Sequence, residues 1–274
     1  MIPVAFDYER ATSAEQALSL LAEHGDDAKL IAGGHSLLPL MKYRLAAPAV
    51  LIDIGRLEEL SYIRDEGGEL AIGALTRHFD VENSDLVQSQ VGLLAAATAE
   101  VGDPQVRHRG TIGGAMAHGD PASDLPAALI ALGGSLVIDG PSGRRQVDVD
   151  SFFTGFLETA LSEEEMLVEV RVPKMPESTW SFQKFNRRAQ DWAIVGSAVV
   201  INNDSCGVGL VNMDSRPIRA SAVEEAISNG ASATEASELA AEGCEPPADI
   251  NAGVDYRRHL ARVLTRRGLE ESGR

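Results

Sequence analysis

Residues 31–38 read Ile-Ala-Gly-Gly-His-Ser-Leu-Leu, and residues 110–115 read Gly-Thr-Ile-Gly-Gly-Ala. Each stretch combines two adjacent glycines with a hydroxyl residue and an apolar neighbour. Adjacent glycines let the backbone reach positive φ and let bare N–H groups approach a ligand closely. Successive exposed N–H groups form a concave site that suits a diphosphate. The two loops therefore predict a ligand with two phosphates and a long body, and a flavin dinucleotide is the obvious candidate.

Either loop alone is weak evidence, because a tight turn with a surface histidine at His35 would read the same way. The pair is more specific, since the second loop leads into an Asp-rich turn at residues 118–124. No Gly-x-Gly-x-x-Gly motif follows a predicted strand with an acidic partner further on, as a Rossmann domain would require. This argues against a nicotinamide-dependent dehydrogenase.

The composition of the chain excludes several classes of protein. Its 274 residues carry a formal net charge of −17, which argues against nucleic acid and against an anionic membrane surface as partners. Two cysteines, Cys206 and Cys244, are too few to hold an iron–sulfur cluster or a structural zinc ion. The first residues have no basic and apolar signal-peptide regions, and we find no transmembrane segment. We expect a cytoplasmic protein.

Hydrophobic periodicity and turn residues predict an alternation of helices and strands. The first part has a helix at 13–24 with Ser13 as its N-cap, strands at 29–32 and 49–54, and a helix or turn at 38–45. Next we expect a strand at 69–73, helices at 84–92, 93–101 and 124–132, a hairpin of 135–139 with 145–149, and a strand at 165–172. After a linker at 173–178 we expect strands at 180–186, 194–202 and 206–213 and helices at 220–228, 232–241 and 255–267.

Four segments together resemble one known family. The first is Ala-Gly-Gly-His-Ser-Leu-Leu-Pro at 32–39 with Lys42, Arg44 and Leu45; the second is Arg-Gly-Thr-Ile-Gly-Gly at 109–114 with Ala117, His118, Asp120, Pro121, Ala122, Asp124 and Pro126. The third is Lys184, Arg187, Arg188, Asp191, Trp192 and Ala193, and the fourth is Tyr256, Arg257, Arg258, His259, Leu260 and Leu264. The chain thereby resembles the FAD-binding medium subunits of carbon monoxide dehydrogenase and xanthine dehydrogenase, the molybdenum hydroxylase family.

The resemblance implies an α+β fold with two domains. Residues 1–175 would form a PCMH-type, vanillyl-alcohol oxidase-like FAD-binding domain of two α/β subdomains, at about 1–55 and 56–175. Residues 176–274 would form a C-terminal domain with a three-stranded antiparallel sheet and helices.

The resemblance also implies a function, that of the flavoprotein subunit of a heterotrimeric molybdenum hydroxylase. A small subunit would hold two [2Fe–2S] clusters, a large subunit would hold a molybdopterin cytosine dinucleotide centre, and the trimer would pair into a dimer of heterotrimers. Substrate would be hydroxylated at molybdenum, and electrons would pass through the clusters to non-covalent FAD and on to an external acceptor. We expect no catalytic residue and no metal ligand on this chain. The sequence of this chain identifies neither the substrate nor the electron acceptor.

The same resemblance selects the cofactor-binding residues. They are Ala32, Gly33, Gly34, His35, Ser36, Leu37, Thr111, Ile112, Gly113, Gly114, His118, Asp124, Lys184 and Trp192. In the first loop the backbone N–H groups and the Ser36 hydroxyl would hold one phosphate. In the second loop Thr111 and the two glycines would serve the other phosphate and the ribose. The family usually has Asn where this chain has Ala115, so one amide contact is lost.

The remaining site residues each have a functional and a structural interpretation. Asp124 would accept a hydrogen bond from a sugar hydroxyl, or it would be the N-cap of the next helix. His118 would face the cofactor, or it would be a structural histidine. Lys184 would place its charge near the flavin ring, or it would end a strand in solvent. Trp192 would stack on the ring, or it would pack in the core.

Two other functions are compatible with the sequence. A free-standing FAD-dependent oxidase would meet its substrate at the flavin, and a histidine such as His35 can link covalently to flavin in enzymes of that kind. A nucleotide-binding module without redox chemistry is the second alternative.

Overall fold

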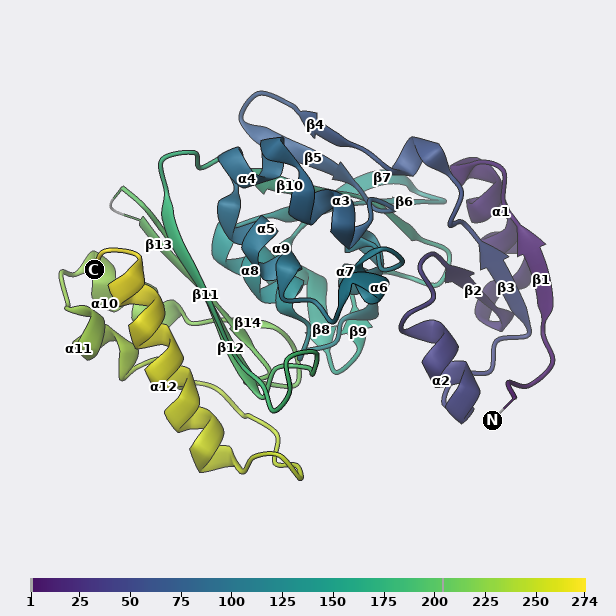
Figure 1. The fold of residues 1–274 in the computed structure, drawn as a ribbon. Coiled ribbons are helices and arrows are strands. Elements are labelled where there is room, and N and C mark those ends of the chain that lie inside the picture. Colours follow the sequence, from purple (N-terminus) through teal and green to yellow (C-terminus); the bar gives the residue numbers. More distant parts are fainter. Residues whose placement is uncertain (1, 204) are drawn as a thin grey trace.

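The computed structural model describes residues 2–203 and 205–274, which form three successive parts (Figure 1). The first contains β1 (Asp7–Arg10), α1 (Ala14–His24), β2 (Ala28–Ile31), α2 (Leu37–Tyr43) and β3 (Val50–Asp53). Its three strands run parallel in the order β1-β3-β2. Ser13 caps α1 as predicted, because its hydroxyl accepts the Gln16 N–H at 3.1 Å. Short 3₁₀ turns lie at Gly25–Asp27 and Glu58–Leu60.

The second part is built on a five-stranded antiparallel sheet. Its order is β4 (Ile63–Asp65), β5 (Glu69–Gly73), β10 (Met166–Pro173), β6 (Ser135–Gly140) and β7 (Gly143–Asp148). Its helices are α3 (His78–Asn83), α4 (Asp85–Gln90), α5 (Gly92–Ala99), α6 (Pro104–Arg107), α7 (Ile112–His118), α8 (Asp124–Leu132) and α9 (Val149–Phe152). Strands β8 (Phe153–Gly155) and β9 (Glu158–Thr159) form a separate small hairpin.

The third part is the C-terminal antiparallel sheet. It contains the three predicted strands, β11 (Thr179–Phe185), β12 (Val195–Asn202) and β13 (Ser205–Val211), and adds a two-residue strand β14 (Ile218–Arg219). Helices α10 (Ser221–Ser228), α11 (Ala233–Ser237) and α12 (Val254–Glu271) follow. Helix α12 packs against β11 and β12. Helix α11 ends at Ser237, earlier than the predicted residue 241.

Helix α8 joins the second and third parts. All nine of its residues are buried, as expected of a helix that is apolar on every side. It packs against β12 and β13 of the C-terminal sheet. A Cβ at Gly209 would lie 2.0 Å from the Ala127 carbonyl oxygen, so glycine lets strand and helix approach closely. This contact fixes the first residue of α8, Asp124, relative to strand β11.

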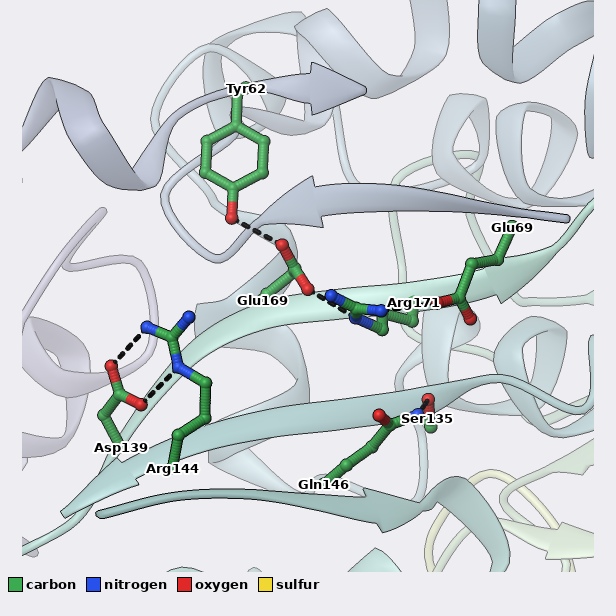
Figure 2. Close-up of polar contacts among 8 residues, drawn as sticks. All are labelled: Tyr62, Glu69, Ser135, Asp139, Arg144, Gln146, Glu169 and Arg171. Carbon is green, nitrogen blue, oxygen red and sulfur yellow. Dashed lines mark hydrogen bonds and ion pairs between the residues drawn. The ribbon is translucent and has the colours of Figure 1, made fainter. Parts of the chain in front are cut away.

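A polar cluster covers part of the face of the five-stranded sheet (Figure 2). The Tyr62 hydroxyl donates to Glu169 at 2.6 Å, and Arg171 pairs with Glu169 at 2.6 Å and Glu69 at 2.5 Å. Burial, followed by the hydrogen bond to Glu169, raises the pKa of Tyr62 to about 12. These groups satisfy one another, so the cluster is a stabilising feature of the sheet.

Within the described ranges, no helix has both the length and the hydropathy needed to cross a bilayer.

Candidate functional site

The first glycine loop follows the carboxyl end of strand β2. Gly34 has φ +78°, a left-handed conformation that favours glycine. Among the described residues, the N–H groups of residues 33–37 donate to no protein acceptor. The Ser36 side chain makes no capping bond to α2. The loop therefore presents consecutive free donors, the arrangement predicted for an anion site.

The two glycine segments touch each other at Gly33. A Cβ on Gly33 would lie 2.2 Å from the Arg109 carbonyl oxygen, well inside any allowed contact. The same oxygen accepts a hydrogen bond from Arg77 Nη1 at 2.5 Å, and Arg77 Nη2 reaches the Gly55 carbonyl at 3.3 Å. Arg77 thus links the second segment to Gly55, which follows strand β3 of the first part. No sequence motif pointed to this residue.

The second glycine segment differs from the prediction, because it is the start of helix α7 and its N–H groups are used internally. Thr111 is the N-cap, and its hydroxyl accepts the Gly114 N–H at 3.1 Å. The N–H groups of Ile112 and Gly113 donate to the Thr76 and Ala74 carbonyls at 3.0 and 2.9 Å. A Cβ on Gly113 would lie 2.4 Å from the Ala74 Cβ. The glycine is needed here for close packing, and the segment does not present free donors.

One cavity of about 820 Å³ brings the predicted site residues together. It is lined by every one of them except Ile112, which is fully buried in the core. At one end it reaches Leu30 and Met166, between the first subdomain and strand β10. At the other end it reaches Lys184 and Trp192 of the C-terminal domain. Its size lies in the range of sites for small molecules and cofactors.

Asp124 and Lys184 form a buried ion pair in the wall of this cavity. Their side chains are 6% and 4% exposed, and Lys184 Nζ lies 2.7 Å from Asp124 Oδ2. Lys184 also donates to the Glu100 carbonyl at 2.8 Å. Lys184 is therefore not the solvent-exposed lysine of the alternative interpretation. The N-cap of α8 is Ser123, so the N-cap interpretation of Asp124 was wrong as well.

Among the residues that the structure describes, the second oxygen of Asp124, Oδ1, has no hydrogen-bond partner although it is buried. Burial raises the pKa of Asp124 to about 6, against the opposing effect of Lys184. Unpaired buried acceptors are costly and rare in proteins. The free Asp124 Oδ1 therefore indicates a hydrogen-bond donor that a ligand in this cavity would supply.

Three further side chains define the two ends of the cavity. Trp192 is 59% exposed, so it is not a core residue as the alternative interpretation had it. His118 is half-buried, and burial lowers its pKa. His35 is exposed at the glycine-loop end. Arg187 and Arg188 do not line this cavity but a separate pocket, although the resemblance had grouped them with Lys184 and Trp192.

Sequence reasoning also missed His78, which lines the cavity beneath the second segment. Its backbone N–H donates to the Gly110 carbonyl at 3.0 Å, and a Cβ on Gly110 would lie 2.5 Å from its ring. Burial, followed by the charges of Arg107 and Arg77, lowers the pKa of His78 to about 4. The ring is therefore neutral at physiological pH, and its buried Nδ1 has no hydrogen-bond partner in the described part of the chain. A single histidine at the start of a short helix gave no sequence signal.

Among residues 2–203 and 205–274, no cluster of His, Cys, Asp and Glu side chains is arranged to hold a metal ion.

Comparison with known proteins gives matches over almost the whole chain. The family model described as the FAD binding domain in molybdopterin dehydrogenase matches residues 4–175, and that of the CO dehydrogenase flavoprotein C-terminal domain matches residues 180–272. The carbon monoxide dehydrogenase medium chain of Hydrogenophaga pseudoflava is 42% identical, over 98% of this chain and 97% of that one. The 6-hydroxypseudooxynicotine dehydrogenase complex subunit alpha of Paenarthrobacter nicotinovorans is 35% identical, over 99% and 96%.

The solved structures give the same result. A structure of carbon monoxide dehydrogenase from Hydrogenophaga pseudoflava, which lacks the Mo-pyranopterin moiety of the molybdenum cofactor, contains a chain that superimposes with a TM-score of 0.96. That chain is 42% identical, and the match covers 99% of this chain and 98% of the other.

Proposed function

Because the chain belongs to the family of FAD-binding flavoprotein subunits of molybdopterin dehydrogenases, we propose that it is the medium subunit of a heterotrimeric molybdenum hydroxylase. It is an oxidoreductase subunit that carries FAD. Substrate is hydroxylated at the molybdenum centre of the large subunit, and electrons reach FAD through the [2Fe–2S] clusters of the small subunit. FAD then passes them to an external acceptor. The observation that carries the proposal is the single cavity joining the glycine loop to Asp124, Lys184 and Trp192.

The residues of the cavity fit FAD. The free N–H groups of residues 33–37, with the Ser36 hydroxyl, would hold the diphosphate. The unpartnered Asp124 Oδ1 would accept a hydrogen bond from a sugar or ribityl hydroxyl. When bound, FAD takes up and releases the electrons of the reaction.

Lys184 and Trp192 would lie at the isoalloxazine end. The ion pair with Asp124 fixes the Lys184 ammonium inside the cavity, where it would place positive charge beside the ring and favour its reduced, anionic form. The exposed indole of Trp192 would cover one face of the ring by stacking. Thr111, Gly113, Gly114 and His118 would contribute surface contacts, since the N–H groups of both glycines are already bonded.

The assembly and its location are part of the same proposal. We place the chain in a dimer of heterotrimers, with the small iron–sulfur and the large molybdenum subunits as partners, in the cytoplasm. Both cysteines, Cys206 and Cys244, are free thiols, which is typical of a reducing compartment. Substrate choice belongs to the large subunit. In support, two relatives of similar length are named for very different compounds, carbon monoxide and 6-hydroxypseudooxynicotine.

The proposal is tested by purifying the native complex through a tag on this chain. We expect one flavin for each copy of the chain, with iron and molybdenum in two co-purifying subunits. Acid precipitation should release the flavin into the supernatant, because FAD is non-covalent.

Flavin that stays in the acid pellet, in a metal-free protein active alone, would favour the free-standing oxidase with a link to His35. A colourless protein would favour the nucleotide-binding module.

A further inference from the structure

A second pocket, of about 490 Å³, lies next to the large cavity. One of its walls is the tip of the β11–β12 hairpin, with Arg187, Arg188 and Trp192. The other wall is the turn that carries Ile250 and Asn251. Asp191 and Trp192 line both this pocket and the large cavity, so the two sites adjoin at these two residues. We refer to this second space as the Arg187 pocket.

The two walls are held together by Arg257, which is buried on helix α12. Its guanidinium donates to the Ile194 carbonyl at the end of the hairpin tip, and through Nη2 to Asp249 Oδ2 at 2.8 Å. Asp249 in turn accepts the backbone N–H of Asn251 at 2.8 Å. A buried guanidinium is costly unless it is well paired, and here its pairing fixes one wall relative to the other. The Arg187 pocket is therefore formed before any ligand arrives.

The side chains of this pocket suit a flat anion. Arg188 pairs with Asp191 at 2.9 Å, whereas Arg187 is exposed and makes no ion pair in the described part of the chain. The indole of Trp192 and the 96% exposed side chain of Ile250 supply apolar surface. A guanidinium binds carboxylate or sulfonate oxygens and stacks on aromatic planes. Asp191 also lines the pocket, but its carboxylate is paired with Arg188, so the Arg187 guanidinium is the positive charge left to attract an anion.

We propose that the Arg187 pocket binds the external electron acceptor, and that this acceptor is a planar, conjugated, negatively charged molecule of the quinone type. The inference rests on the proposed function, because it requires FAD in the adjoining large cavity. The acceptor takes up two electrons and two protons. FAD bound in the large cavity would supply the two electrons and one proton, and the second proton would come from water.

The first test measures turnover of the intact complex with dyes of opposite charge. Arg187→Ala should raise the KM for anionic dichlorophenolindophenol about tenfold, as expected for loss of one charge-assisted contact. The KM for cationic phenazine methosulfate should not rise. Arg266→Ala is the matched control, because Arg266 lies on α12 outside the pocket and is only loosely paired with Glu270, at 3.8 Å.

The second test measures binding without any redox chemistry. Isothermal titration calorimetry of the oxidised complex with naphthalenesulfonate should show one site for each copy of this chain. Arg187→Ala should weaken that site about tenfold, and Arg266→Ala should leave it unchanged.

The proposal is overturned if Arg187→Ala changes the KM for both dyes equally or for neither. It is also overturned if naphthalenesulfonate does not bind, which would mean that a partner polypeptide covers the pocket. If either outcome is found in a complex with full flavin content, it contradicts the acceptor site at the Arg187 pocket and leaves the proposed function intact. A complex that lacks flavin or metals would instead contradict the proposed function.

Discussion

Gly33→Ala tests whether the contact between the two glycine segments shapes the cofactor site. The Cβ of alanine would lie 2.2 Å from the Arg109 carbonyl oxygen and 3.1 Å from the Gly110 Cα. Gly33 does not have positive φ, so alanine adds steric conflict there without a φ penalty. The conflict is with backbone, which Arg77 holds in place, so the first loop must move.

The expected cost follows from the size of that conflict. Overpacking a well-packed position by one methyl group costs about 1–3 kcal/mol. If the displaced loop misaligns the free N–H groups, the same energy appears as FAD affinity about 5- to 150-fold weaker. The assay is titration of the flavin-depleted complex with FAD, followed by flavin fluorescence. Gly68→Ala is the control, since a Cβ there meets nothing within 4 Å and its φ is not positive. Wild-type affinity in Gly33→Ala, or an equal loss in Gly68→Ala, would refute the reasoning.

Three further predictions concern stability. The raised pKa of Asp124, about 6, means that the folded state binds the proton more tightly than the unfolded state. The free energy of unfolding should therefore fall as pH rises from about 4 to 6. In urea denaturation at different pH values, Asp124→Asn should not show this fall. The lowered pKa of His78, about 4, means that the unfolded state binds the proton more tightly than the folded state. The free energy of unfolding should therefore fall as pH falls from 6.5 to 4. His78→Gln should show a smaller fall in the same assay. Tyr62→Phe removes the hydrogen bond to Glu169 and should cost about 1 kcal/mol in chemical denaturation while leaving FAD affinity unchanged; a change in FAD affinity would contradict the placement of this cluster outside the site.

The first glycine loop could be predicted because its signals are local. The strand expected at 29–32 and the helix or turn at 38–45 correspond to β2 (Ala28–Ile31) and α2 (Leu37–Tyr43). A buried strand, paired glycines and a following apolar run specify a strand, turn and helix without distant contacts. The free N–H groups between them follow from that local geometry.

The second segment could not be predicted as easily, because its N–H acceptors are far away in the sequence. The donors of Ile112 and Gly113 bond to the Thr76 and Ala74 carbonyls, which belong to the turn after strand β5. Paired glycines in a sequence are compatible both with an open anion site and with close packing of a helix on a strand. Which of the two applies depends on the residues that contact the glycines in the folded protein. Here Gly113 packs closely against Ala74.

Short elements were missed for a related reason. Strand β1 (Asp7–Arg10) and strand β4 (Ile63–Asp65) are mostly exposed and polar, so neither shows the alternation of apolar residues that identifies a strand. Both lie at the edge of their sheets and are defined by pairing with β3 and β5. Their existence depends on the neighbouring strand, which a local pattern does not contain.

The two ends of the large cavity are built in physically different ways. At the glycine end the donors are backbone N–H groups, so many side-chain changes around residues 33–37 would leave them in place. At the other end the chemistry depends on the pair of Asp124 and Lys184, which are 60 residues apart and held in register by the packing of α8 on the C-terminal sheet. Losing Asp124 would leave the Lys184 ammonium buried without its carboxylate, at a cost of about 3–5 kcal/mol. Substitutions where α8 packs on the C-terminal sheet should therefore change the surroundings of the flavin ring more than they weaken binding of the diphosphate.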